Sequence, residues 1–182
     1  MTTEAELVAY YDRTRQYYSP LAGPGTFRDM LDAVGVDYVK PPVLDLGCGD
    51  GRLVRHLESM MNVTYDTYVG VDYAQMRVRT AREWWPTLNF VYGDVNEWLT
   101  TYDGPKFGLV VAVEVLEHLE DPLSVVEASR GLLADGGVMV GTVPINMPDR
   151  AHLQVFESAD DVTERLSPVR VVERGSHWVL RW

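Results

Sequence analysis

Apolar runs and helical patterns alternate along the chain from residue 41 onward. Five apolar runs predict β-strands, at residues 43–46, 65–72, 88–92, 107–113 and 138–143. Between them, apolar residues recur with helical spacing at residues 52–61, 74–85 and 123–133. The fourth run, FGLVVAV, is continuously apolar, which is typical of a strand covered on both faces. This alternation predicts an α/β fold with an open, mostly parallel sheet and helices on both faces.

The end of the chain departs from this alternation. Ser158 is placed to cap a helix that reaches Leu166, and two β runs follow at residues 169–173 and 177–182. The short gap between these runs predicts a hairpin, so one strand at the end of the sheet should be antiparallel.

The beginning of the chain carries two further helical patterns. A tyrosine-rich pattern covers residues 3–18, and a second short helix is predicted at residues 26–34. These helices either cover the sheet or form a lid over a ligand, and the residues leave both alternatives open.

Composition predicts one globular domain over residues 1–182. The chain is 46% hydrophobic and 24% charged, and its length suffices to bury a core. The net charge of −11, from 16 basic and 27 acidic residues, repels nucleic acid and anionic membranes. The sequence has no leader pattern and no apolar stretch of about 18 residues. We therefore expect a soluble, cytoplasmic protein without a membrane partner.

The segment VLDLGCGDGR at residues 43–52 carries the clearest candidate chemistry. Gly47, Gly49 and Gly51 alternate between a predicted strand and a predicted helix, which suits a tight turn that lies against a ligand. The spacing differs from the G-x-G-x-x-G of dinucleotide folds, and no Lys-Ser or Lys-Thr pair follows as in a P-loop. Asp45 would repel a phosphate but suits an ammonium group. The turn therefore predicts a zwitterionic ligand that carries adenosine, and Cys48 within it is interpreted as a packing residue rather than a nucleophile.

Two more acidic residues follow the next strands. Asp72 ends the second predicted strand and precedes Tyr73, and Asp94 follows the third strand. An acid at the end of the second strand can accept both ribose hydroxyls, and an acid after the third can accept from an adenine amino group. A single aspartate at a strand end is more often a helix cap, but three such acids in one sheet favour a ligand site.

Further segments of the sequence complete a recognisable series. They are VGVDYA at 69–74, FVYGDV at 90–95, LVVAVEVLEHLEDP at 109–122 and LLADGGVMVGTVP at 132–144. Together with VLDLGCGDG, they resemble the five motifs of class I S-adenosylmethionine-dependent methyltransferases, in particular the small type 11/12-like members. The resemblance covers residues 41–182 and implies a seven-stranded, Rossmann-like methyltransferase sheet with its last strand antiparallel. It implies that residues 1–40 form a variable helical cap.

The resemblance also implies the cofactor and its contacts. The cofactor would be S-adenosylmethionine, with S-adenosylhomocysteine as product. Carried over by position, the methionine part faces Asp45, Gly47 and Gly49, and the ribose faces Asp72. The adenine face and edge would meet Tyr73, Asp94 and the backbone of Val95, and Glu114 would border the methyl group.

Methyl transfer from a sulfonium mainly requires a nucleophile held in line with the methyl group, although a hydroxyl acceptor benefits from a base or a metal. The candidate catalytic residues are Glu114, His118 and His152, with Glu117 beside them. Glu114, Glu117 and His118 would share one face if their segment were helical, and with His152 they would make a metal site of two histidines and two carboxylates.

This arrangement is similar to that of small-RNA 3′-end 2′-O-methyltransferases and ubiquinone-pathway O-methyltransferases, which use a divalent ion. E-x-x-E-H also occurs in this class without metal, where the histidine shapes the floor of the pocket. We favour an acid/base or structural role for His118 and assign no metal ligand, with a divalent metal as the alternative.

The sequence thus predicts a methyltransferase that acts on an oxygen or nitrogen of a small molecule, as a monomer or homodimer. One alternative is a metal-assisted 2′-O-methyltransferase on RNA ends, or a related enzyme that acts on a protein. Another is a non-catalytic partner domain that binds S-adenosylmethionine, although the intact glycines and the three acids argue against it.

Overall fold

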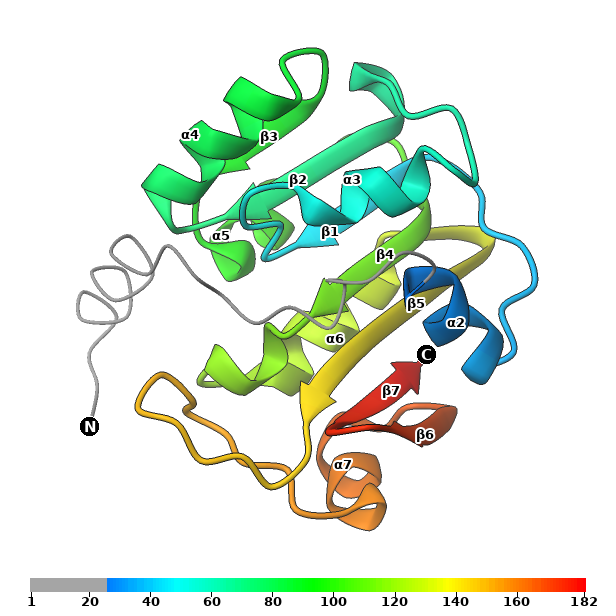
Figure 1. The fold of residues 1–182 in the computed structure, drawn as a ribbon, viewed down its shortest axis with the longest axis vertical. Coiled ribbons are helices and arrows are strands. Elements are labelled where there is room, and N and C mark those ends of the chain that lie inside the picture. Colours follow the sequence, from blue (N-terminus) through cyan, green and yellow to red (C-terminus); the bar gives the residue numbers. More distant parts are fainter. Residues whose placement is uncertain (1–25) are drawn as a thin grey trace.

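The computed structural model describes residues 26–182, which form a sheet between two layers of helices (Figure 1). The helix predicted at residues 3–18 lies outside the described residues. Within residues 26–182, seven strands form one sheet: β1 (Val43–Leu46), β2 (Tyr68–Asp72), β3 (Asn89–Tyr92), β4 (Phe107–Val113), β5 (Leu133–Pro144), β6 (Arg170–Arg174) and β7 (His177–Arg181).

The strand order is β3-β2-β1-β4-β5-β7-β6. Strands β1 to β5 pair in parallel, and β7 runs antiparallel to both β5 and β6. The predicted fold class, the terminal hairpin and the antiparallel last strand are therefore confirmed. The order reverses between β1 and β4, and the carboxyl ends of the parallel strands meet at one edge, where ligands bind in such sheets.

Helices cover both faces of the sheet, as predicted. They are α2 (Thr26–Ala33), α3 (Arg52–Leu57), α4 (Gln75–Trp84), α5 (Val95–Thr101), α6 (Pro122–Gly131) and α7 (Ala159–Leu166), with the short 3-10 helices η1 (Tyr65–Thr67) and η2 (Leu116–His118). In the described part of the chain, no helix is long and apolar enough to cross a membrane.

The alternation of side chains along each strand produces two core clusters, one on each face. Val43 packs with residues of α2, α3 and α4, whereas Leu44 and Leu46 pack with residues of α5, α6 and α7. Phe27 and Leu31 of α2 are fully buried in the first cluster. Helix α2 therefore covers the sheet, which was the simpler of the two alternatives for this segment.

Two predicted boundaries were wrong because polar residues form local turns. The strand predicted at residues 65–72 begins only at Tyr68, since Thr64 and Thr67 form a capping box around η1. The helix predicted at residues 52–61 ends at Leu57, and the Ser59 hydroxyl donates to the His56 carbonyl just beyond it.

Two other elements differ from the prediction near the third and fifth strands. Helix α5 was not predicted, although Asp94 followed by Glu97 is a common signal of a helix start. Helix α6 ends at Gly131 rather than at residue 133, because Leu133 already pairs with Phe107 as the start of β5.

Candidate functional site

The turn after β1 has the conformation that its glycines predict. Gly47, Gly49 and Gly51 all adopt positive φ, at 63°, 54° and 79°. A Cβ on Gly47 would lie 2.2 Å from a methyl group of Val115, so the turn packs closely on the segment after β4. A Cβ on Gly49 would meet no heavy atom of the described residues within 4 Å. Among the described residues, nothing therefore blocks the approach of a ligand to the backbone of Gly49.

Asp72 lies beside this turn at the end of β2. Its two carboxylate oxygens accept the backbone N–H groups of Gly49 at 2.8 Å and Ala74 at 2.7 Å. Burial raises the pKa of Asp72, and these two hydrogen bonds lower it in part. The side chain thus ties the glycine turn to the start of α4, a role that sequence reasoning did not foresee.

Asp45 lies inside β1 rather than after it, and only 4% of it is exposed. Its Oδ2 accepts the hydroxyl of Tyr68 at 2.7 Å. Burial raises the pKa of Asp45 from 3.8 to about 7, against the lowering effect of the Tyr68 hydrogen bond. Tyr68 was missed because it is 23 residues away and looks like an ordinary strand residue.

The other predicted cofactor residues lie at the carboxyl ends of β2 and β3. Tyr73 directly follows β2 and is half-buried. Asp94 caps α5, since its Oδ1 accepts the backbone N–H groups of Asn96 and Glu97. Val95 begins α5 with a buried side chain. Asp94 is therefore a helix cap whether or not it also binds a ligand.

Cys48 lies within the glycine turn and is buried. A Cβ on Gly70 would lie 2.9 Å from its sulfur, so the two residues pack against each other. Burial, followed by the charges of Asp72 and Asp45, raises the pKa of the Cys48 thiol well above its usual range. A protonated, buried thiol suits the packing role expected for this residue.

Glu114 directly follows β4 and has a positive φ of 56°. Its Oε1 accepts the Thr142 hydroxyl at 2.8 Å, and its Oε2 lies 3.0 Å from His177 Nε2. The side chains of Glu114 and His177 are each only 7% exposed. Both carboxylate oxygens are thus engaged by β5 and β7, partners that sequence reasoning missed.

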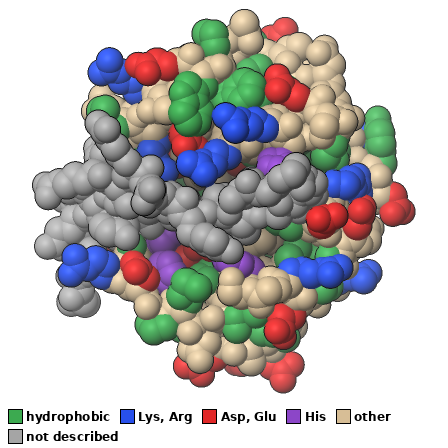
Figure 2. Space-filling model, in the orientation of Figure 1, with side chains coloured by type: hydrophobic (Ala, Val, Ile, Leu, Met, Phe, Trp, Pro, Cys, Tyr) green, Lys and Arg blue, Asp and Glu red, His purple; other side chains and the backbone are tan. Residues whose placement is uncertain are grey.

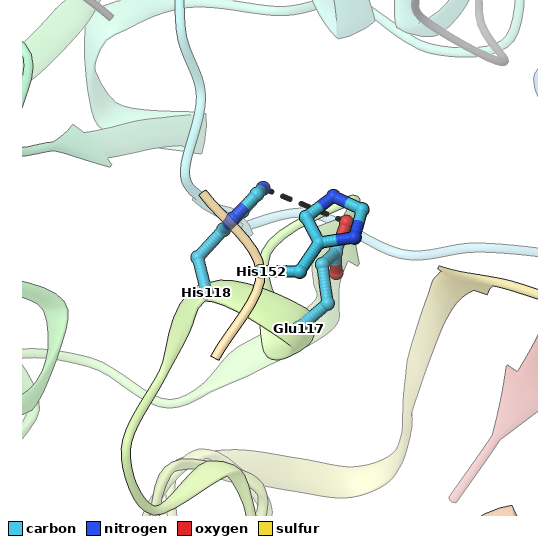
Figure 3. A group of neighbouring side chains, drawn as sticks. All are labelled: Glu117, His118 and His152. Atoms are coloured by element: carbon cyan, nitrogen blue, oxygen red, sulfur yellow. Dashed lines mark ion pairs between the residues drawn. The ribbon is translucent and has the colours of Figure 1, made fainter. Parts of the chain in front are cut away.

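The remaining candidates form a cluster between η2 and the loop after β5 (Figure 3). The ligand atoms of Glu117, His118 and His152 all lie within 4.8 Å of one another. His118 Nε2 lies 3.6 Å from Glu117 Oε1, and the two imidazole rings have centroids 5.0 Å apart. The structure therefore brings together three of the four residues considered for a metal site, without Glu114.

The shared helical face considered for Glu114, Glu117 and His118 was wrong. Only Leu116–His118 form a helical turn, η2, and Glu114 lies before it with a left-handed backbone. In this conformation the two carboxylate oxygens of Glu114 contact Thr142 and His177, and its charge still acts on Glu117 and His118.

Burial sets the protonation of this cluster. Desolvation lowers the pKa of His118 from 6.5 to about 4, so its imidazole is neutral at pH 7. Desolvation, followed by the charge of Glu114, raises the pKa of Glu117 well above its usual range. His118 Nδ1 lies 2.9 Å from the Ala151 carbonyl, which it can reach only as a donor. Its Nε2 is then an acceptor that faces Glu117.

Glu117, His118 and His152 also fit a divalent cation as a set of three ligands. His152 Nδ1 lies 2.7 Å from the Met147 carbonyl, so each histidine directs its Nδ1 to a backbone carbonyl, and Nε2 is the ring nitrogen suited to bind a metal. The Glu117 carboxylate is fully buried, and neither oxygen has a hydrogen-bond partner among the described residues. A cation or a proton would compensate this carboxylate.

These features define a class of protein. An α/β sheet that reverses its order between β1 and β4, with a glycine turn and an acid at adjacent carboxyl ends, is a Rossmann-like cofactor-binding fold. Residues 11–175 match the family described as methyltransferase domain. The chain therefore belongs to this family of methyltransferase domains.

Curated relatives agree with this assignment. The chain is 33% identical over 141 residues to a ubiquinone biosynthesis O-methyltransferase of Psychrobacter cryohalolentis, which covers 74% of this chain and 50% of the relative. It is 29% identical over 132 residues to a trans-aconitate 2-methyltransferase of Rhizobium etli, covering 72% of this chain and 49% of the relative. The chain spans about half the length of these curated relatives.

Solved structures share the fold over almost the whole chain. The DhpI–SAM–HEP complex has a TM-score of 0.69 at 19% identity, and the match covers 100% of this chain and 99% of the DhpI chain. The N-methyltransferase NodS of Bradyrhizobium japonicum, in complex with S-adenosyl-L-homocysteine, has a TM-score of 0.66 at 17% identity. This match covers 96% of this chain and 94% of the NodS chain. At these identities, the likeness establishes the Rossmann-like methyltransferase fold.

Proposed function

We propose that this chain is an S-adenosylmethionine-dependent methyltransferase that acts on an oxygen or nitrogen of a small molecule. The observation that carries the proposal is the turn of residues 47–51. It presents glycines at positive φ, a Gly49 that no other described residue crowds, and the Asp72 carboxylate at its side. Relatives named for methylation of small molecules, and structures named as complexes with the cofactor or its product, support it.

In this proposal, the carboxyl edge of the sheet holds the cofactor from three adjacent strands. Asp45, Gly47 and Gly49 would contact the methionine part. Asp72 would accept the ribose hydroxyls, because each oxygen keeps a lone pair beside its backbone donor. The adenine would lie between Tyr73, Asp94 and the backbone of Val95.

Once bound, S-adenosylmethionine supplies an activated methyl group. The chain then has to hold the acceptor atom in line with that group and exclude water. His118 is placed to orient the acceptor, because its neutral Nε2 can accept a proton or hydrogen bond from a hydroxyl or an amine. His152 would contact the acceptor from the facing loop, and Glu114 would border the methyl group as a fixed, paired carboxylate.

Two features support a small acceptor over RNA. The chain has a net charge of −11. On the part of the visible face that described residues form, basic side chains are interspersed with acidic ones (Figure 2). An RNA backbone requires clustered lysine and arginine.

We also propose that residues 1–182 form one methyltransferase domain, in which α2 joins the core of residues 41–182 through Phe27 and Leu31.

The cluster of Glu117, His118 and His152 supports a second candidate, a metal-assisted O-methyltransferase. Its ligand atoms lie within 4.8 Å of one another, close enough to converge on one cation. We rank it second because Glu114, the fourth ligand considered from the sequence, is engaged elsewhere.

One experiment separates these candidates. Methyl transfer from S-adenosylmethionine is measured against pools of small metabolites and of RNA, in a chelator and after addition of excess magnesium or manganese. We expect transfer to the small-molecule pool that persists in chelator. Activity that vanishes in chelator and returns with metal would favour the second candidate, and transfer to RNA alone would contradict a small acceptor.

The His118→Ala variant tests the role of His118 in both candidate functions. If the acceptor is a hydroxyl, His118→Ala should lower the turnover by about 10²- to 10⁴-fold while the affinity for S-adenosylhomocysteine stays nearly unchanged. Asp135→Ala is the control, because Asp135 is exposed near the amino end of β5, at the opposite edge of the sheet. Full activity of His118→Ala would leave positioning by other residues as the mechanism.

A further inference from the structure

Asp45 is a buried carboxylate without a cationic partner. It is 4% exposed, and within the described part of the chain no lysine, arginine or histidine forms an ion pair with it. Because an isolated buried charge is costly, a buried carboxylate in this position keeps its proton to a higher pH than an exposed one.

Tyr68 determines how this carboxylate is presented. It is fully buried on β2, next to β1, and its hydroxyl donates to Asp45 Oδ2 at 2.7 Å. Tyr68 is held on its other side by Phe90, whose ring meets it edge-on with centroids 5.4 Å apart. The Tyr68 hydrogen bond thus fixes one oxygen of this carboxylate, two residues before the glycine turn.

Among residues 26–182, the groups around Asp45 give it no other counter-charge. The neighbouring β4 is continuously apolar, and β2 contributes Tyr68 and Asp72. The turn adds Cys48 and Asp50, and Arg52 of α3 pairs with Asp50. Arg77 of α4 acts on Asp72. Arg52 and Arg77 thus act on Asp50 and Asp72, whereas the side-chain partner of Asp45 in the described part of the chain is the Tyr68 hydroxyl.

We propose that Tyr68 is a positioning residue that orients Asp45 toward the ammonium group of the cofactor, and that Asp45 releases its proton to solvent when this group binds. The inference rests on the proposed function, because it takes the cofactor from there. In this step no covalent bond of the cofactor changes. The Asp45 carboxyl loses its O–H proton to water, and the carboxylate pairs with the ammonium.

The number of protons released when the ligand binds can be measured. With a pKa of about 7 in the free protein, Asp45 is mostly protonated at pH 6 and mostly ionised at pH 7.5. Binding of S-adenosylhomocysteine should therefore release about 0.9 proton at pH 6 and about 0.2 at pH 7.5. The affinity should rise by about 25-fold between pH 5.5 and pH 7.5 and then level off.

Calorimetry tests this directly. S-adenosylhomocysteine is titrated into the full chain at each pH in buffers of different ionisation enthalpy, so that the proton count follows from the slope of the observed enthalpy. Asp45→Asn should release almost no proton and lose most of the pH dependence. Tyr68→Phe removes the hydrogen bond that lowers the pKa of Asp45, so the midpoint of its affinity curve should move to higher pH. Tyr65→Phe is the matched control, because Tyr65 is 61% exposed.

The outcomes are distinct. Absence of binding at every pH overturns the proposed function and this inference with it. Binding with constant affinity and no proton release overturns the inference alone, and so does proton release that persists in Asp45→Asn. A Tyr68→Phe variant that is less stable but keeps the wild-type midpoint and proton count would show a purely structural tyrosine, which overturns its positioning role.

Discussion

Burial of Asp45 makes the free protein less stable as the pH rises. Its pKa is raised from 3.8 to about 7, so the folded state holds a proton that the unfolded state has already lost between these values. The free energy of unfolding should therefore fall by about 3 kcal/mol between pH 4 and pH 7 through this residue, and become level above about pH 8.

Asp45→Asn should remove this dependence while keeping an acceptor for Tyr68. In urea unfolding without ligand, we expect the variant to gain stability relative to the wild type at pH 7.5 compared with pH 4.5. Asp135→Asn, at an exposed position, should show the same difference from wild type at both values. An equal effect of Asp45→Asn at the two pH values would contradict the raised pKa.

His118 responds in the opposite direction, because burial lowers its pKa from 6.5 to about 4. Below pH 6.5 the unfolded state binds a proton that the folded state refuses, so this residue destabilises the fold as the pH falls toward 4. The imidazole resonance of His118, assigned by its loss in His118→Gln, should barely move between pH 7 and pH 5.5. A titration of this resonance with its midpoint near pH 6.5 would contradict a neutral, buried imidazole.

The sequence predicted which residues gather at the site better than it predicted what they touch. The glycine turn and Asp72 could be placed because their spacing along the chain is itself the signal. The contacts of Asp45 with Tyr68 and of Glu114 with His177 could not, since they join positions 23 and 63 residues apart. Such pairings depend on strand register and side-chain direction, which periodicity does not contain.

Among the elements, three strands are joined by one buried polar network. Glu114 after β4 accepts from Thr142 of β5 and lies 3.0 Å from His177 at the start of β7. Removal of one partner leaves a buried carboxylate oxygen unpaired, which typically costs about 3–5 kcal/mol. His177→Ala should lower the free energy of unfolding by an amount in this range.

A double-mutant cycle separates this pairing from loss of packing. Glu114→Gln and His177→Gln, alone and combined, should show a coupling free energy above about 1 kcal/mol in urea unfolding. Additive effects would mean that the two side chains are neighbours without a significant interaction. Because the network ends at the edge that carries Glu117 and His118, the single variants should also loosen the site.

The elements that were predicted correctly are those with the clearest local sequence patterns. Strands β1 and β4 were predicted with their observed ends, because each is an apolar run bounded by turn residues. Helix α5 was missed since Val95–Thr101 is short and Asp94 was assigned to the adenine rather than to a helix cap. Its cap uses one carboxylate oxygen, so both roles are compatible.

At the scale of the whole molecule, a cofactor at the carboxyl edge would connect strands that are otherwise linked mainly through the sheet. A ligand that binds only the folded state at 100 times its dissociation constant adds about 2.7 kcal/mol of stability. For a chain of this size, this corresponds to a rise in melting temperature of about 5–10 °C. S-adenosylhomocysteine should produce such a shift with the wild-type protein.

Asp72→Ala tests whether this stabilisation depends on a contact between Asp72 and the ribose. The variant loses its bonds to Gly49 and Ala74, so its own melting temperature should fall even without ligand. Its ligand-induced shift, measured from that lower value at the same concentration, should shrink to about 1 °C or less, because the loss of two charge-assisted bonds of about 1.5 kcal/mol or more each weakens binding at least about 150-fold. Asp135→Ala should keep the full shift. A full shift in Asp72→Ala would assign the ribose to other residues, and no shift in the wild type would contradict cofactor binding by this chain.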